Sequence, residues 1–264
     1  MNTIAVPSPV TFDSASFTAQ ALASPAALAA VLDHTLLKPE ATRAQVVHLC
    51  HEAAHHRFAC AMVNPAWVAT AAETLAGTGV PVGVVIGFPL GATLSASKRD
   101  EAVRVLKLGA HDLDMVLNIG LLKSAAGGGP NARADYEAVR QDIRGVVELA
   151  HAAGAIVKVI LETCLLTFEE KLRASEIALA AGADFIKTST GFSSGGATAD
   201  DIALMRSVAG VRAGVKASGG IRTLADATTM LRAGATRIGA SASVKILAEL
   251  ASGQPATPAP ASGY

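Results

Sequence analysis

One unit recurs along this chain: an Ala- and Leu-rich stretch with helical periodicity ends at a glycine, and a short apolar run follows at once. Four copies carry Gly-Ala at the junction, at Gly109, Gly154, Gly182 and Gly234. Glycine suits the left-handed conformation that ends a helix. A short continuous apolar run is typical of a strand buried on both faces of a parallel sheet. The repeat therefore predicts helices that alternate with parallel strands.

Eight apolar runs fit this pattern, and helical patterns fill the gaps between them. The predicted strands are Leu32–Leu36, Phe58–Val63, Val82–Ile86, Asp112–Leu117, Ile156–Ile160, Phe185–Thr188, Gly214–Ala217 and Arg237–Gly239. The predicted helices include Arg43–His56, Leu94–Leu108, Tyr136–Ala152, Phe168–Ala180, Ala199–Val208 and Ala225–Ala233. Eight such units in 264 residues, 51% of them hydrophobic, predict an α/β chain folded as a (β/α)8 TIM barrel. A doubly wound open sheet is the alternative, but no dinucleotide or phosphate glycine motif follows the first predicted strand.

The ends of the chain differ from the barrel segment, which we place at residues 21–250. Residues 1–20 mix Pro, Ser and Thr without periodicity and are expected to be mobile, as is the Pro/Ala-rich tail 251–264. No apolar run approaches the roughly 20 residues that span a membrane. A balance of 22 basic and 22 acidic residues argues against a nucleic-acid surface. The three cysteines have no metal-site spacing, and without a secretory signal we expect a cytoplasmic protein with reduced thiols.

Two lysines stand where predicted strands give way to Gly/Ser-rich loops. Lys187 precedes Thr-Ser-Thr-Gly, and Lys216 precedes Ala-Ser-Gly-Gly. Catalytic groups of such barrels sit at the carboxyl ends of the strands. Burial and a second cation on the neighbouring strand both lower the pKa of a lysine. A neutral lysine amine attacks carbonyl carbon to form a Schiff base, so the pair predicts an enzyme that acts on an aldehyde or ketone.

Acidic and basic residues inside the other strands extend this prediction. Asp114 lies within the apolar run Leu113–Leu117, and a buried carboxylate there needs a partner such as Lys216. The same carboxylate could relay protons to the reacting groups. Lys158 and Glu162 are expected to be neighbours of this network rather than principal groups.

Two glycine-rich loops are candidates for holding a phosphate. One is Ser218-Gly219-Gly220, and the other runs from Gly239 to Ser241 and beyond. Barrels of this kind often bind phosphate through backbone N–H groups after the seventh and eighth strands. Thr188, which ends the predicted sixth strand, and Gly191 in the loop after it complete the predicted substrate-binding set.

The motifs at Lys187-Thr-Ser-Thr-Gly191 and Lys216-Ala-Ser-Gly-Gly220 resemble those of the deoxyribose-phosphate aldolases, a family of class I barrel aldolases. The likeness extends from Ala27 to Leu250 and includes Asp112-Leu-Asp114-Met-Val. The resemblance implies reversible cleavage of 2-deoxy-D-ribose 5-phosphate to D-glyceraldehyde 3-phosphate and acetaldehyde. It implies Lys187 as the Schiff-base lysine, Lys216 as the group that lowers its pKa, and Asp114 as the acid/base aspartate. It implies neither a metal nor an organic cofactor. It implies sugar phosphates and aldehydes as small-molecule substrates, and a homo-oligomer, with a homodimer as the common form among relatives.

Three positions qualify the resemblance. Met62 stands where many relatives carry cysteine, which predicts better tolerance of acetaldehyde because a thioether does not add to a reactive enal. Phe192 stands where some relatives carry a lysine that helps hold the phosphate, which leaves more of that task to backbone amides. The chain ends in Tyr264, and some relatives end in a tyrosine that assists proton transfer.

Other interpretations remain open from the residues alone. Lys216 could be the nucleophile in place of Lys187. Another Schiff-base barrel aldolase, of the transaldolase or fructose-bisphosphate type, would place its lysine on another strand. A catalytically silent barrel that binds a sugar phosphate would keep the loops without the chemistry.

Overall fold

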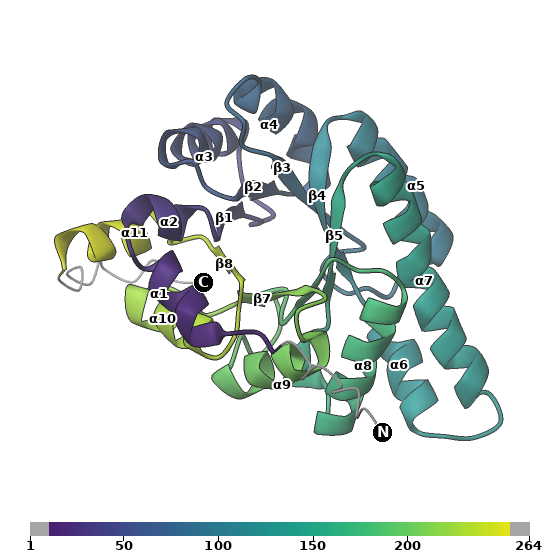
Figure 1. The fold of residues 1–264 in the computed structure, drawn as a ribbon. Helices are drawn as coiled ribbons and strands as arrows, with labels where there is room; N and C mark the ends of the chain where they lie inside the picture. The colour runs from purple at the N-terminus through teal and green to yellow at the C-terminus, as the bar shows by residue number, and fades with distance from the viewer. Residues whose placement is uncertain (1–10, 254–264) are drawn as a thin grey trace, which may run out of the picture.

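A single closed barrel of eight parallel strands forms the centre of the computed structural model, which describes residues 11–253 (Figure 1). The strands follow one another around the barrel in chain order, and β8 pairs with β1. Their bounds are β1 Leu32–Leu36, β2 Cys60–Val63, β3 Val82–Ile86, β4 Ala110–Val116, β5 Ile156–Ile160, β6 Phe185–Lys187, β7 Gly214–Ser218 and β8 Arg237–Ala240. The predicted fold class is confirmed, and the open-sheet alternative is wrong.

Helices surround this barrel on the outside, as Figure 1 shows. They are α1 Ser14–Ala21, α2 Pro25–Ala29, α3 Arg43–His56, α4 Val68–Leu75, α5 Ser95–Lys107, α6 Ile119–Ala126, α7 Ala132–Ala152, α8 Phe168–Ala180, α9 Ala199–Ala209, α10 Leu224–Arg232 and α11 Ser243–Ser252. Capping boxes start three of them, at Thr42, Thr167 and Thr223, where each hydroxyl accepts from the backbone three residues on. These local signals fix where the helices begin, and hence how long the loops over the barrel mouth are.

The apolar side chains form two separate cores. The large one fills the layer between the strands and the surrounding helices. The small one consists of Leu37, Cys60, Met62 and Val85, with Phe88 packed against it. The strands contribute residues to both cores because alternate side chains of a barrel strand point inward and outward.

The amino-terminal segment differs from the prediction. Residues 14–20 were expected to be mobile, but they lie in helix α1, which Asp13 caps through the backbone N–H of Ser16. Phe17 of α1 packs against the large core, and Arg206 lies over the ring of Phe12. A helix cap and one apolar contact therefore keep this segment helical, although its sequence shows only weak periodicity. Residues 1–10 and most of the predicted tail, including Tyr264, lie outside the described residues. Among residues 11–253, no helix is long and apolar enough to cross a bilayer.

Candidate active site

The two lysines and Asp114 meet inside the barrel. Lys187 of β6 and Lys216 of β7 are paired residues in the sheet register. Their amines both lie on one oxygen, Oδ2 of Asp114 in β4, at 2.6 Å and 2.7 Å. All three side chains are almost completely buried. The expected ion pair between Asp114 and Lys216 is confirmed, and Lys187 shares the same carboxylate.

A second layer of charged side chains adjoins this triad. Asp33 of β1 contacts Lys216 through Oδ2 at 2.5 Å and Arg237 through Oδ1 at 2.8 Å. Lys158 of β5 lies against the carboxylate of Asp112 and 3.2 Å from Oδ1 of Asp114. Lys158 is thus a neighbour of the network, as predicted. The sequence prediction did not place Arg237 or Asp112 in the site. A charged residue is rare in a strand that is buried on both faces, and this alone could have indicated both residues.

Burial and these contacts set the protonation of the amines. Burial lowers the pKa of Lys187; Asp114 opposes that shift, and the cation of Lys216 adds to it. Burial also disfavours the ammonium of Lys216, but Asp114 and Asp33 outweigh it and hold the pKa above its usual value. Burial lowers the pKa of Lys158 to about 7, against the attraction of Asp33. The pKa of Lys187 is therefore lowered and that of Lys216 is raised, so Lys187 loses its proton more readily than its paired lysine.

The carboxylate of Asp33 completes this electrostatic picture. Burial alone would raise its pKa, but Lys216, Lys158 and Arg237 outweigh burial and hold the pKa well below its usual range. Asp33 therefore remains ionised and keeps Lys216 charged.

A missing side chain makes room for Lys216. A Cβ added at Gly239 of β8 would lie 2.9 Å from Cε of Lys216 and 2.4 Å from Oγ of Ser218. Glycine at this position therefore lets the lysine stem cross the barrel interior. Gly239 was predicted as part of a phosphate loop, but it lies inside strand β8 and is buried.

The ends of β6 and β7 and the loops after them contain further residues of the predicted substrate-binding set. Thr188 joins the two loops, because its hydroxyl donates to the carbonyl of Ser218 and accepts from the N–H of Ser218, each at 3.1 Å. Gly219 and Gly220 both have positive φ, at 87° and 79°, as does Gly191 at 85°. Within residues 11–253 the hydroxyl of Ser218 has no hydrogen-bond partner; it is buried and lies against Gly239 of β8.

Ser241 is exposed directly after β8. Its strand neighbours β7, because Gly239 pairs with Ser218 in the sheet register. Ser241 also borders a cleft of about 400 Å³ between β1 and α3 whose lining includes His34, Gln45 and Glu52.

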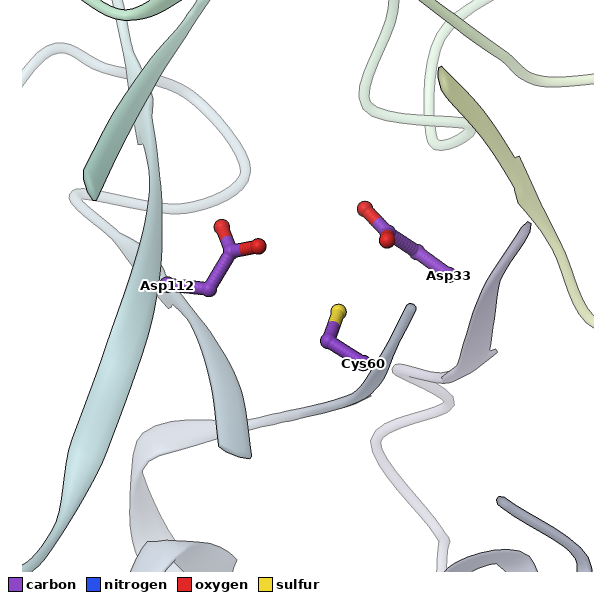
Figure 2. Close-up of side chains that lie close together, drawn as sticks. All are labelled: Asp33, Cys60 and Asp112. Carbon is purple, nitrogen blue, oxygen red and sulfur yellow. The ribbon is translucent and has the colours of Figure 1, made fainter. Parts of the chain in front are cut away.

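One cluster has the composition of a metal site. The ligand atoms of Asp33, Cys60 and Asp112 lie within 4.8 Å of one another, and Figure 2 shows the three side chains pointing toward a common space. Lys158 contacts Asp112 there and lies 3.7 Å from Asp33. Burial raises the pKa of the Cys60 thiol, with Asp33 adding to the shift, so the thiolate that a metal prefers is disfavoured. Nζ of Lys158 thus lies in the space that a metal ion would need.

Glu162, which the sequence placed near the network, instead supports the loop after β6. It is buried with a positive φ of 56°, and its carboxylate accepts from the hydroxyl and the N–H of Thr190. The strained backbone at Glu162 aims the carboxylate at the loop that follows Lys187.

A closed barrel that holds a lysine with a lowered pKa, a second lysine with a raised pKa and a carboxylate shared by both defines a class: the barrel aldolases that work through a lysine. Residues 27–249 match the profile of the DeoC/LacD family aldolases, and the chain belongs to this family. It is an aldolase, a carbon–carbon lyase.

Named relatives agree with this assignment. The chain is 54% identical over 220 residues to the deoxyribose-phosphate aldolase of Bacillus subtilis, covering 83% of this chain and 94% of that protein. The deoxyribose-phosphate aldolase of a Geobacillus species is 53% identical over 220 residues, with the same coverage. The structure of the Aeropyrum pernix deoxyribose phosphate aldolase, described as tetrameric, superposes with a TM-score of 0.81 at 37% identity, over 91% of this chain and 97% of that one.

Proposed function

We propose that the protein is a deoxyribose-phosphate aldolase that cleaves 2-deoxy-D-ribose 5-phosphate reversibly to D-glyceraldehyde 3-phosphate and acetaldehyde. The observation that carries the proposal is the sharing of one carboxylate oxygen of Asp114 by the amines of Lys187 and Lys216. A neutral amine, a cation that keeps it neutral and a proton carrier are what Schiff-base aldol chemistry requires. Relatives named deoxyribose-phosphate aldolase, at 53% and 54% identity, support the choice of substrate.

The proposed mechanism begins when the neutral amine of Lys187 attacks C1 of the open-chain sugar. Asp114 carries protons to and from the carbinolamine, which loses water and becomes an iminium. The C2–C3 bond then breaks, its electron pair moves toward the iminium, and the C3 hydroxyl loses its proton as glyceraldehyde 3-phosphate forms. The remaining enamine takes up a proton at carbon, and water releases acetaldehyde from Lys187. Lys216 stays charged throughout and keeps the free amine of Lys187 neutral.

The proposed phosphate contacts come chiefly from the loop after β7. Backbone N–H groups of the positive-φ glycines Gly219 and Gly220 can approach an anion closely, and the buried hydroxyl of Ser218 adds a donor. Ser241 would join them only from the rim of the barrel. The exposed ring of Phe192 supplies no donor to a phosphate.

Assembly and location form the remaining part of the proposal. We expect a homo-oligomer, with a homodimer as its simplest form, and a cytoplasmic site of action on small sugar phosphates and aldehydes. Sedimentation analysis at micromolar protein concentration measures the oligomeric state.

Borohydride trapping tests the central proposal. The protein is incubated with acetaldehyde or deoxyribose 5-phosphate, reduced, and read by intact and peptide mass spectrometry. We expect a reduced adduct on Lys187 that is absent in Lys187→Ala, together with cleavage of deoxyribose 5-phosphate. An adduct on Lys216 would mean that Lys216, and not Lys187, is the nucleophile. A folded protein that gives neither adduct nor cleavage would support the catalytically silent binding barrel instead.

A further inference from the structure

The loop after β6 ends against the glycine loop after β7. Its last residues, Gly196 and Ala197, precede Thr198, which caps the start of α9. The N–H of Ala197 donates to the carbonyl of Gly219 at 3.1 Å. The pair Gly196 and Ala197, here called the backing segment, therefore joins the amino end of α9 to the loop that follows β7.

Gly196 packs so closely on Gly219 that no side chain fits between them. A Cβ added at Gly196 would lie 2.4 Å from the carbonyl oxygen of Gly219 and 2.6 Å from its carbonyl carbon. Both of these atoms belong to the backbone, so the peptide itself would have to move. Gly196 does not have a left-handed φ, so it is the contact, and not the backbone conformation, that requires a glycine there.

The carbonyl of Gly219 points away from the barrel interior. Its partner Ala197 packs against the large core between the strands and the helices, and α9 lies on the outer side of the barrel against β7 (Figure 1). The C=O and N–H groups of a trans peptide point in opposite directions. The N–H of Gly220 therefore points inward, toward the mouth of the barrel, and it donates to no backbone carbonyl of residues 11–253.

The backing segment also restricts a loop that would otherwise be flexible. Two successive glycines, Gly219 and Gly220, have access to more backbone conformations than any other pair of residues. The hydrogen bond from Ala197 and the close contact with Gly196 hold the peptide between them in one orientation. The backing segment is fixed in turn by α9, because the hydroxyl of Thr198 accepts from the N–H of Asp201 at 3.1 Å. The donor at Gly220 is thus oriented before any anion arrives, which lowers the entropic cost of binding one.

We propose that Gly196 and Ala197 are positioning residues that hold the peptide between Gly219 and Gly220 so that its N–H faces the phosphate of the sugar. The inference rests on the proposed function, since the phosphate belongs to the proposed substrate. The backing segment acts only through Gly219 and takes no part in the chemistry at Lys187. It therefore sets how tightly the enzyme holds a phosphorylated substrate, and leaves Schiff-base formation with an unphosphorylated aldehyde unaffected.

The variant Gly196→Ala tests the backing segment, because its Cβ must displace the carbonyl of Gly219. Three quantities are measured: the KM for deoxyribose 5-phosphate, the inhibition constant of inorganic phosphate, and the rate of borohydride trapping with acetaldehyde. Loss of one hydrogen bond to a charged group corresponds to a factor of about ten to a hundred, so we expect the first two constants to rise by that factor. Trapping with acetaldehyde, which carries no phosphate, should be unchanged.

Gly195→Ala is the matched control, since it adds the same methyl group one residue earlier in the same loop. A Cβ at Gly195 would lie 2.6 Å from Cβ of Cys164, an exposed residue after β5, and would meet Cys164 instead of Gly219. We expect native values of all three quantities in this variant.

The possible results separate this proposal from the preceding one. Raised constants with unchanged acetaldehyde trapping in Gly196→Ala, and native values in Gly195→Ala, support the positioning role. Unchanged constants in Gly196→Ala overturn it and leave the proposed function intact, provided that the native protein cleaves deoxyribose 5-phosphate. An equal rise in Gly195→Ala overturns it as well, because any distortion of the loop would then suffice. Loss of acetaldehyde trapping in Gly196→Ala also overturns it, since the substitution would then act on Lys187 or on the fold, which circular dichroism distinguishes. A native protein that gives neither cleavage nor adduct would reject both proposals.

Discussion

Replacing Lys216 with methionine should move the pH dependence of Lys187 by a predictable amount. Both amines contact the same oxygen of Asp114, at 2.6 Å and 2.7 Å, and neither is exposed. Two unit charges roughly 5 Å apart in a medium of effective dielectric constant about 20 repel by about 3 kcal/mol. That energy corresponds to about two pKa units. Because the repulsion acts only on the ammonium form of Lys187, removing the cation raises the pKa of Lys187.

The sign of the effect on activity follows directly. Schiff-base formation requires the neutral amine, so its rate rises with pH through the pKa of Lys187 and then levels off. In Lys216→Met that rise should lie about two pH units higher, and the rate near pH 7 should fall about a hundredfold from protonation alone. At high pH, where Lys187 is neutral in both proteins, the two rates should approach each other, apart from any proton transfer that Lys216 performs.

The assay is single-turnover trapping of acetaldehyde by borohydride between pH 5 and 10, read as adduct on Lys187. Lys245→Met serves as control, since it removes a partly exposed lysine of α11 that lies 3.7 Å from Glu249. A loss of equal size at every pH in Lys216→Met would refute the reasoning, because it would assign Lys216 a role in proton transfer or packing rather than in the pKa of Lys187.

The remaining predictions concern single positions. Arg237→Met should lower the free energy of unfolding, measured in urea, by about 3 kcal/mol because a buried carboxylate loses a partner, and Arg237→Lys should recover part of it; equal midpoints for all three proteins would contradict this. Gly239→Ala places a Cβ 2.9 Å from Cε of Lys216, so kcat should fall about a hundredfold with the fold retained; an unchanged kcat would mean that Lys216 tolerates the shift. Met62→Cys should lose activity faster than the native protein in concentrated acetaldehyde, and equal half-lives would remove the hypothesis. Deletion of Tyr264 should slow turnover without changing the melting temperature; an unchanged rate would assign the terminal residue no catalytic part.

The strands could be predicted closely from the sequence because a parallel barrel strand is apolar on both faces. The bounds of three strands, including Leu32–Leu36 and Val82–Ile86, agree with the prediction, and the others differ by one or two residues at an end. Helix α1 could not be predicted in this way, since its stability depends on a cap at Asp13 and on one contact of Phe17 with residues distant in the chain.

The candidate site was predictable only in part, for a geometric reason. Lys187, Lys216 and Asp114 follow from charges at strand ends, but apolar periodicity does not tell which strand residues face the barrel interior. The contact of Arg237 with Asp33 joins the last strand to the first, which only closure of the barrel brings together. The edge-to-face contact of Phe88 with Phe192 is a second case, since the two rings come from loops after β3 and β6, which are not adjacent strands.

Charge balance explains why the site needs so many groups. The buried cluster holds three carboxylates and four basic side chains, so charging all of them would leave a net positive charge without solvent. Arg237 does not deprotonate, Lys216 contacts two carboxylates, and Lys158 lies against one and near two more. Within residues 11–253, Lys187 contacts one carboxylate oxygen, that of Asp114, which it shares with Lys216. The lowered pKa of Lys187 is therefore a property of the whole cluster, and any substitution that removes a cation from the cluster should raise it.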